Sequence, residues 1–323
     1  MNSVGFVNPL PRALSHYERE LTSLFSEGAS EGTLERVSVR TAELGTSIRA
    51  RKLLAAAGHL RALRALRTPF IELWPVTGHL EALGTRSSVD ASVIFHDPDP
   101  IRRQFGYDPR SIRTGVARAN ATGLTAIVHS RAAEERIREL GYRKVRNLPH
   151  PMLEPRASII DGQAPVIRVL GQFKPTRDVD LLARLGPLLR HAGIETEIIG
   201  RGWPLINGWH VRDEFVTEAE LDALIEGSAA VLIPYSRYWQ SGIAVRALER
   251  GVSVVGASNG FLTELLGEDA GTIVSDTIDP SAWLTAALAA VGTSRREIAQ
   301  AAFTYHHRAS AAWQAFVAER RHP

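Results

Sequence analysis

Short apolar runs alternate with helical periodicity along the first half of the chain. Apolar runs bounded by turn residues predict strands, whereas apolar positions three or four residues apart predict helices. We predict strands at residues 4–7, 37–40, 70–73, 91–95, 124–129 and 145–148. We predict helices at residues 11–26, 46–66, 112–121 and 132–140.

The same alternation returns after a stretch rich in proline and glycine that ends at Pro165. The predicted strands there are residues 166–170, 195–199, 229–233, 252–255 and 272–274. The predicted helices are residues 178–191, 218–226, 242–250, 261–266 and 281–291, and residues 294–321 also follow a helical pattern.

This order predicts an α/β fold with parallel sheets, because parallel strands need crossover connections and helices supply them. We expect two Rossmann-like doubly wound domains that face a cleft, at residues 1–150 and 166–293, joined by a linker at 151–165. A C-terminal helix at 294–323 is expected to pack back on the first domain through Trp313 and Phe316.

Composition removes several function classes. The chain has 323 residues, of which 44% are hydrophobic, and it contains no cysteine, so disulfides, thiolate chemistry and cysteine–zinc sites are excluded. No His-x-x-x-His pair is present, and we predict neither a metal nor a cofactor. The N-terminus lacks the pattern of a secretory signal and no apolar run is long enough to span a membrane, which predicts a cytoplasmic protein.

Arginines are concentrated between Arg49 and Arg67 in a predicted amphipathic helix, with leucines from Leu53 to Leu63 on one stripe. One interpretation is a solvated helix face. The other is a peripheral contact with anionic headgroups at the inner face of a membrane, or with a lipid-diphosphate acceptor. No nucleic-acid motif accompanies the arginines, so we predict no nucleic-acid partner.

Two loops in the second domain are suited to bind an anion. In GQFKPTRDVDLL, Gly171 ends a strand, and Lys174 and Arg177 precede a helix that Asp178 can cap. Two cations beside a helix N-terminus suit the diphosphate of a nucleotide sugar, whose negative charge grows as the sugar bond breaks.

The second loop follows the apolar strand AVLIP. Ser241, Gly242 and Ile243 open a helix there and can direct backbone N–H groups at an anion. Gln240 offers an amide for a sugar hydroxyl, and Tyr235 offers a flat face for a sugar or a base.

These segments resemble the two-Rossmann "GT-B" glycosyltransferases, most closely the retaining family four. That family typically has Gly-Arg-x-x-x-x-Lys-Gly-x-x-x-Leu-Leu, and here Gln172 stands at its arginine and Arg177 at its lysine. Its Glu-x7-Glu turn looks like QSGIAVRALERGVSVVGAS, with Gln240 at the first glutamate. In the family, the second glutamate of this turn holds the nucleotide ribose. Its position falls near Arg246 in this sequence, and Glu249 is the nearby carboxylate. The resemblance implies retention of anomeric configuration.

The first domain offers candidate catalytic and acceptor-binding residues. His96 and Asp97 directly follow an apolar strand, where a doubly wound domain presents functional side chains, and Arg102 stands close behind. They can orient the acceptor or accept its proton, although Asp97 can also simply cap the strand end. Asn8 ends the first strand and His16 opens the next helix, which makes both weaker acceptor-binding candidates.

The sequence therefore predicts a glycosyltransferase that moves a sugar from a nucleoside-diphosphate sugar to a glycan, lipid-linked or small-molecule acceptor without a metal. Two alternatives stay open. One is an enzyme like the nucleotide-sugar 2-epimerases, and the other is a non-catalytic nucleotide-sugar-binding partner in polysaccharide assembly. A dinucleotide oxidoreductase is disfavoured because no Gly-x-Gly-x-x-Gly follows any predicted strand.

Overall fold

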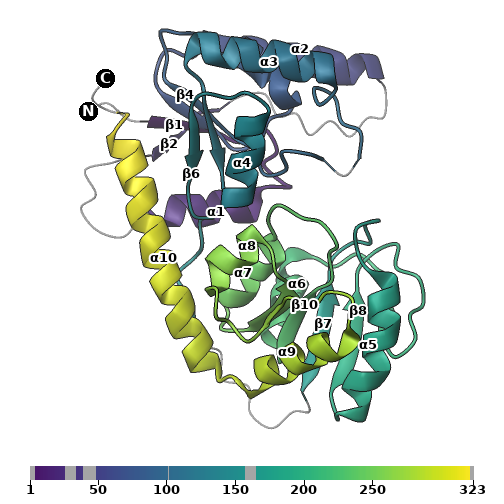
Figure 1. Cartoon of the computed structure of the whole chain (residues 1–323). Helices are drawn as coiled ribbons and strands as arrows, with labels where there is room; N and C mark the ends of the chain where they lie inside the picture. Colours follow the sequence, from purple (N-terminus) through teal and green to yellow (C-terminus); the bar gives the residue numbers. More distant parts are fainter. Residues whose placement is uncertain (1–3, 26–33, 39–48, 101, 157–164, 321–323) are drawn as a thin grey trace. The chain divides into compact units, whose positions relative to one another are not determined.

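The computed structural model describes residues 4–25, 34–38, 49–100, 102–156 and 165–320 (Figure 1). Predictions that concern residues 26, 39–40, 46–48 and 157–164 lie outside these ranges. The chain divides into two compact units, Met1–Leu153 with Arg308–Pro323, and Glu154–His307. We refer to them as unit 1 and unit 2.

Unit 1 contains a parallel sheet whose described strands follow the order β2-β1-β3-β4-β5-β6. The strands are β1 (Val4–Val7), β2 (Leu34–Arg36), β3 (Phe70–Glu72), β4 (Ala91–Ile94), β5 (Thr125–Val128) and β6 (Val145–Asn147). The helices are α1 (Ser15–Ser23), α2 (Arg49–Ala65), the 3₁₀ helix η1 (Gly78–Gly84), α3 (Pro109–Thr122) and α4 (Arg131–Glu139).

One face of this sheet packs on α1 and on the end of α10 (Arg295–Ala318). Trp313 is completely buried in that core, and its indole N–H donates to the carbonyl of Pro149 at 2.9 Å. Gln314 donates to the carbonyl of Leu24, the residue that ends α1. The predicted return of the C-terminal helix to the first domain is confirmed.

Unit 2 contains a second parallel sheet, with the described strands in the order β12-β11-β10-β7-β8-β9. The strands are β7 (Val166–Leu170), β8 (Glu195–Ile199), β9 (His210–Arg212), β10 (Ala230–Ile233), β11 (Ser253–Ala257) and β12 (Ile273–Val274). The helices are α5 (Val179–His191), α6 (Glu218–Glu226), α7 (Gly242–Leu248), α8 (Gly260–Leu266) and α9 (Pro280–Gly292).

Helices α5 and α9 lie side by side in this unit and share one hydrophobic core with strands β7, β8, β10 and β11 (Figure 1). Trp283 of α9 is the largest fully buried side chain of that core. Helix α7 also packs on β10 and β11. The predicted α/β fold with two doubly wound parallel sheets is confirmed.

Local predictions fail where the pattern is weak. Strand β2 ends before the predicted 37–40. Strand β9 and η1 were not predicted, because β9 has only three residues and η1 is a short 3₁₀ helix of seven. The single leucine stripe predicted in α2 is wrong, since Leu63 is buried whereas Leu53 and Leu54 are 55% and 74% exposed. His59, four residues before Leu63 on α2, is also buried, and its side chain is polar.

Candidate functional site

The candidate donor site lies where the strand order of the unit 2 sheet reverses. From the centre of the sheet, β7, β8 and β9 follow in order toward one edge, and β10, β11 and β12 follow in order toward the other edge. In open parallel sheets, ligands bind outside the carboxyl ends of the strands at such a switch point. Gly171 follows β7 and Tyr235 follows β10, so both predicted anion loops leave the sheet at this point.

Arg177 connects the two loops. Its backbone forms an antiparallel bridge with Tyr235. Its Nη2 donates to the carbonyl of Leu170 at 2.8 Å and to the hydroxyl of Tyr235 at 3.0 Å. The guanidinium also lies over the ring of Trp203, 4.8 Å from its centroid, and over the ring of Tyr235 at 4.9 Å.

This arginine is buried without a carboxylate beside it. Only 4% of Arg177 is exposed, no acid of the described residues forms an ion pair with it, and its buried Nε has no hydrogen-bond partner there. Burial lowers the pKa of Arg177, although the Tyr235 hydroxyl partly opposes the shift. A buried cation is costly unless an anion accompanies it.

Arg246 in the same unit shows the usual arrangement for comparison. It is equally buried, but Glu218 and Asp222 each accept from it at 2.5 Å. Arg246 stands near the position at which the family places its second glutamate, so this position carries a structural ion pair. The chain therefore neutralises one buried arginine internally and gives Arg177 no carboxylate partner among the described residues.

Glycine is required beside Arg177. Gly171 has a φ of +94°, and a Cβ there would lie 3.1 Å from Arg177 Nη2. A Cβ on Gly200, which follows β8, would lie 2.2 Å from the carbonyl oxygen of Gly171. These two positions let the segments that follow β7 and β8 approach each other closely beside the guanidinium.

The start of α7 supplies backbone donors from the second loop. Ser241 is the N-cap, and its Oγ accepts from the N–H of Ala244 at 3.3 Å. Gly242 and Ile243 are the first two helical residues, whose N–H groups no intrahelical carbonyl can reach. A Cβ on Gly242 would meet nothing within 4 Å, which indicates open space at this helix end.

The other predicted donor-binding residues fall into two groups. Gln172 and Lys174 are exposed on the loop that leads to Arg177, and Gln240 is half-buried beside the N-cap of α7. Glu249 lies instead at the C-cap of α7, about 10 Å along the helix from its first residue. Its backbone carbonyl accepts from the N–H of Arg156. The structure does not bring Glu249 together with the start of α7.

Trp203 was missed by sequence analysis. Its indole N–H donates to the carbonyl of Gly171 at 2.8 Å, so its ring is fixed against Arg177. The residue follows β8 in the segment Gly-Arg-Gly-Trp. An aromatic residue just beyond the carboxyl end of a parallel strand was the signal that could have found it.

In unit 1, His96 follows β4 and is buried against Trp74, whose ring stacks on it at 5.1 Å. His96 Nε2 lies 2.8 Å from the carbonyl oxygen of Leu73. A carbonyl can only accept, so Nε2 carries a proton and donates to it. Asp97 is half-buried next to it, and Arg102 is exposed.

Two further histidines, His129 and His150, lie near His96, and sequence analysis did not predict that the three would form a group. His129 follows β5, and the ring centroids of His96 and His129 are 5.6 Å apart. His129 Nδ1 lies 2.9 Å from the carbonyl of Leu148, so it donates there and Nε2 accepts from the Tyr17 hydroxyl. Burial, with the neighbouring His150 and His96, holds the pKa of His129 well below its usual 6.5.

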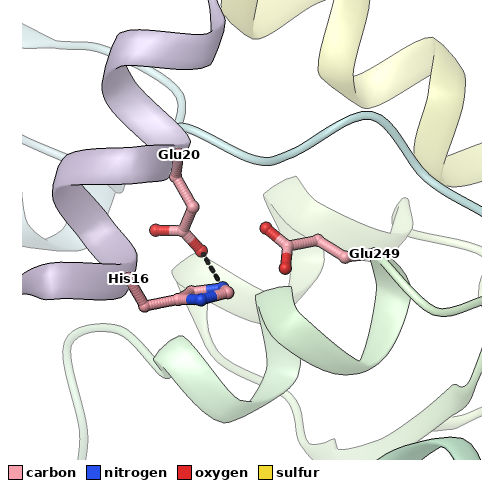
Figure 2. A group of neighbouring side chains, drawn as sticks. All are labelled: His16, Glu20 and Glu249. Carbon is pink, nitrogen blue, oxygen red and sulfur yellow. Dashed lines mark ion pairs between the residues drawn. The ribbon is translucent and has the colours of Figure 1, made fainter. Parts of the chain in front are cut away.

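The two weaker acceptor candidates make local contacts. Asn8 Oδ1 accepts from the N–H of Leu10 at 2.9 Å, and its Nδ2 donates to Glu18 at 2.5 Å. His16 Nε2 lies 3.3 Å from Glu20 Oε1 one turn along α1 (Figure 2). Both residues therefore fix the turn and the helix that follow β1.

Solved structures share this fold. A sucrose-phosphate synthase from Thermosynechococcus elongatus aligns over 98% of this chain and 97% of its own with a TM-score of 0.66 and 13% identity. WaaG, a glycosyltransferase involved in lipopolysaccharide biosynthesis, aligns over 99% of this chain and 100% of its own, with a TM-score of 0.60 and 14% identity. S. aureus TarM, in complex with fondaparinux, alpha-GlcNAc-glycerol and UDP, aligns over 78% of this chain with a TM-score of 0.54 and 11% identity.

The chain spans 54% of that TarM structure and 61% of the GtfA/B chain that it also resembles. No family model matches the chain, and no curated protein sequence matches it. These likenesses confirm the predicted GT-B fold. Among the helices that the structure describes, none has the length and apolar character needed to cross a bilayer.

Proposed function

We propose that this protein is a glycosyltransferase whose unit 2 binds a nucleoside-diphosphate sugar, with the diphosphate at Arg177. The observation that carries the proposal is this buried guanidinium without a carboxylate, placed at the switch point of the sheet. A diphosphate supplies the missing negative charge and can accept from the Nε–H as well.

The surrounding groups suit the rest of such a donor. The N–H groups of Gly242 and Ile243 are further donors for phosphate oxygens, and Lys174 adds an exposed cation on the same loop. Gln240 suits a sugar hydroxyl. Protein cations and amides then neutralise the leaving diphosphate, and we propose transfer without a catalytic metal.

We assign the acceptor to unit 1. His96, whose Nε2 donates to the carbonyl of Leu73, and Asp97, the next residue in the chain, are the candidates to orient the acceptor hydroxyl or to accept its proton. Retention of configuration remains part of the proposal through the family resemblance alone. A glycan, a lipid-linked acceptor or a small molecule all fit the chemistry of one activated hydroxyl group.

Helix α2 supports a peripheral membrane contact on the cytoplasmic side as part of this proposal. Leu53 and Leu54 are 55% and 74% exposed, and the exposed Arg51 and Lys52 directly precede them. Exposed leucines beside cations are the features by which a helix binds at an anionic lipid surface. A lipid-linked acceptor would then be reached at that surface.

Isothermal titration with UDP, GDP, ADP and their sugars tests the donor site. We expect at least one nucleoside diphosphate to bind in the presence of EDTA, and Arg177→Ala to weaken it by about 2–4 kcal/mol, which is roughly thirtyfold to nine-hundredfold. Arg184→Ala is the matched control, because Arg184 is an exposed arginine on α5 of the same unit. The affinity of the Arg184→Ala variant for the nucleoside diphosphate should stay within twofold of the wild-type value.

Equal affinities of the Arg177→Ala variant and the wild type would refute the diphosphate assignment. Binding that requires Mg²⁺ would refute the metal-free mechanism. Turnover of the donor sugar without any acceptor would favour an epimerase, and donor binding without transfer to any acceptor would favour a non-catalytic binding protein.

A further inference from the structure

Three buried ionisable side chains meet in unit 1, and none of them has been assigned above to a donor or an acceptor. His59 comes from α2, Glu72 from the end of β3, and Glu81 from η1. Their exposed fractions are 1%, 0% and 0%. His59 Nε2 lies 2.6 Å from Glu72 Oε1 and 3.0 Å from Glu81 Oε1.

The cluster has more polar atoms than internal hydrogen bonds. Glu72 Oε2 and His59 Nδ1 are buried and have no hydrogen-bond partner among the described residues. Glu81 Oε1 pairs with His59 Nε2, and the other oxygen of Glu81 accepts from the N–H and the hydroxyl of Thr77 at 2.7 and 2.8 Å. A buried carboxylate oxygen without a partner is costly, and a cation is a partner that satisfies it.

The geometry also suits one ion. One ligand atom from each of the three side chains lies within 4.8 Å of the others. Ligands of a zinc ion lie about 2.0–2.2 Å from it, so two of them are at most about 4.4 Å apart, and ligand atoms at the 4.8 Å limit would need to approach by a few tenths of an ångström to bind one ion. One imidazole nitrogen with carboxylate oxygens is a zinc ligand set, and the second oxygen of Glu72 can supply a fourth donor.

We infer that His59, Glu72 and Glu81 form a structural site for a divalent transition-metal ion, with Zn²⁺ as the preferred occupant. Its full enclosure is typical of structural rather than catalytic zinc sites. The ion would join α2, β3 and η1. Glu72 is also the residue before Leu73, whose carbonyl fixes His96, so the ion would stabilise the strand end that orients that histidine.

The test uses the full chain after removal of any affinity tag and of metal by chelation. Zn²⁺ and Co²⁺ should each bind with a stoichiometry of one per chain and raise the melting temperature. The Co²⁺ form should develop the visible absorption of a low-coordinate site. His59→Gln and Glu81→Gln should weaken Co²⁺ binding at least about a hundredfold, because each removes a direct ligand.

His129→Gln is the matched control, since His129 is an equally buried histidine of unit 1 outside the cluster. It should keep the stoichiometry and the Co²⁺ spectrum. Absence of stoichiometric binding to the wild type, or equal binding to the ligand variants, would overturn the inference. If those variants do not fold, anomalous diffraction at the zinc edge decides. An ion among the three side chains supports the site, and an ion only elsewhere rejects it.

Discussion

Arg177 and Arg246 are two buried arginines of one unit with opposite electrostatic surroundings. Arg246 has two carboxylates as partners, whereas Arg177 has aromatic faces, a hydroxyl and a carbonyl. Neutral groups solvate a guanidinium only in part, so Arg177 makes the ligand-free protein less stable than it could be. Residues that bind charged ligands commonly lower stability in this way.

Arg177→Met should therefore separate stability from binding. We expect the free energy of unfolding of the ligand-free protein to stay within about 1 kcal/mol of wild type or to rise, because an apolar chain replaces an uncompensated buried charge. Arg246→Met should cause a larger loss, because it removes two ion pairs and leaves Glu218 without its cation, although Asp222 keeps Arg250. Urea unfolding of both variants provides the comparison, and a larger loss for Arg177→Met would contradict this account.

His129 gives unit 1 a sensitivity to acid. Its pKa is lowered in the folded protein, so below pH 6.5 the unfolded chain binds a proton that the folded chain does not. Stability is then present above pH 6.5 and is lost as the pH falls toward the lowered folded value. His96, His150 and the Tyr17 hydroxyl face its ring, and Glu20 lies 4.0 Å beyond His150.

Between pH 7.5 and 5.5, this one group should cost about 1.4 kcal/mol of unfolding free energy. His129→Gln should be less stable than wild type at pH 7.5, because Tyr17 and Leu148 lose their partner. Between these two pH values, the unfolding free energy of His129→Gln should nevertheless fall by about 1.4 kcal/mol less than that of the wild type. Urea midpoints at the two pH values measure the difference, and parallel declines would show that His129 does not titrate on unfolding.

At the scale of elements, α2 joins a buried polar cluster to an exposed apolar pair. His59 and Leu63 face the interior, while Leu53 and Leu54 are exposed. Leu53→Ser with Leu54→Ser should reduce binding to vesicles that contain anionic phospholipid and leave the melting temperature unchanged, because neither leucine is buried. Co-sedimentation measures this. Equal binding of variant and wild type would refute the membrane contact, and neutral vesicles are the control.

The positions of the two loops after β7 and β10 could be predicted from sequence because their signals are local. A strand that ends in Gly171 and a cation just before a helix cap place Arg177 at a strand end without knowledge of the sheet order. Its burial, and its contact with Trp203, could not be predicted, because they depend on which strands are neighbours. The bridge from Arg177 to Tyr235 joins segments that are 58 residues apart in the chain.

The cluster of His59, Glu72 and Glu81 could not be predicted for a related reason. Its members lie on a helix, a strand and a 3₁₀ helix, at spacings that match no ligand motif. The sequence also made α2 look like a helix with one apolar stripe. Burial of His59 changes which face of α2 points inward, and only tertiary packing determines that choice.

At the scale of the whole molecule, the two units should respond to different ligands. A nucleoside diphosphate at one hundred times its dissociation constant adds about 2.7 kcal/mol to the stability of the state that binds it. Hydrogen exchange should therefore slow in β7 and β10 of unit 2 when nucleotide is added. It should slow in β3 and β4 of unit 1 when Zn²⁺ is added.

Mass spectrometry of the exchanging amides tests this separation. Nucleotide that protects β3 as strongly as β7 would show that the two units open together and not independently. The Arg177→Ala and Glu81→Gln variants are the controls, since each should abolish protection by one ligand and keep protection by the other.

The crowding at Gly171 and Gly200 sets a boundary for engineering. Because any side chain at Gly200 would overlap the backbone after β7, attempts to change donor choice gain nothing from diversifying this pair. Gln172 is exposed on the same loop, and Gln240 is the side chain that we propose binds the sugar. Directed evolution toward new sugars should therefore vary these two glutamines and keep Lys174 and the two glycines constant.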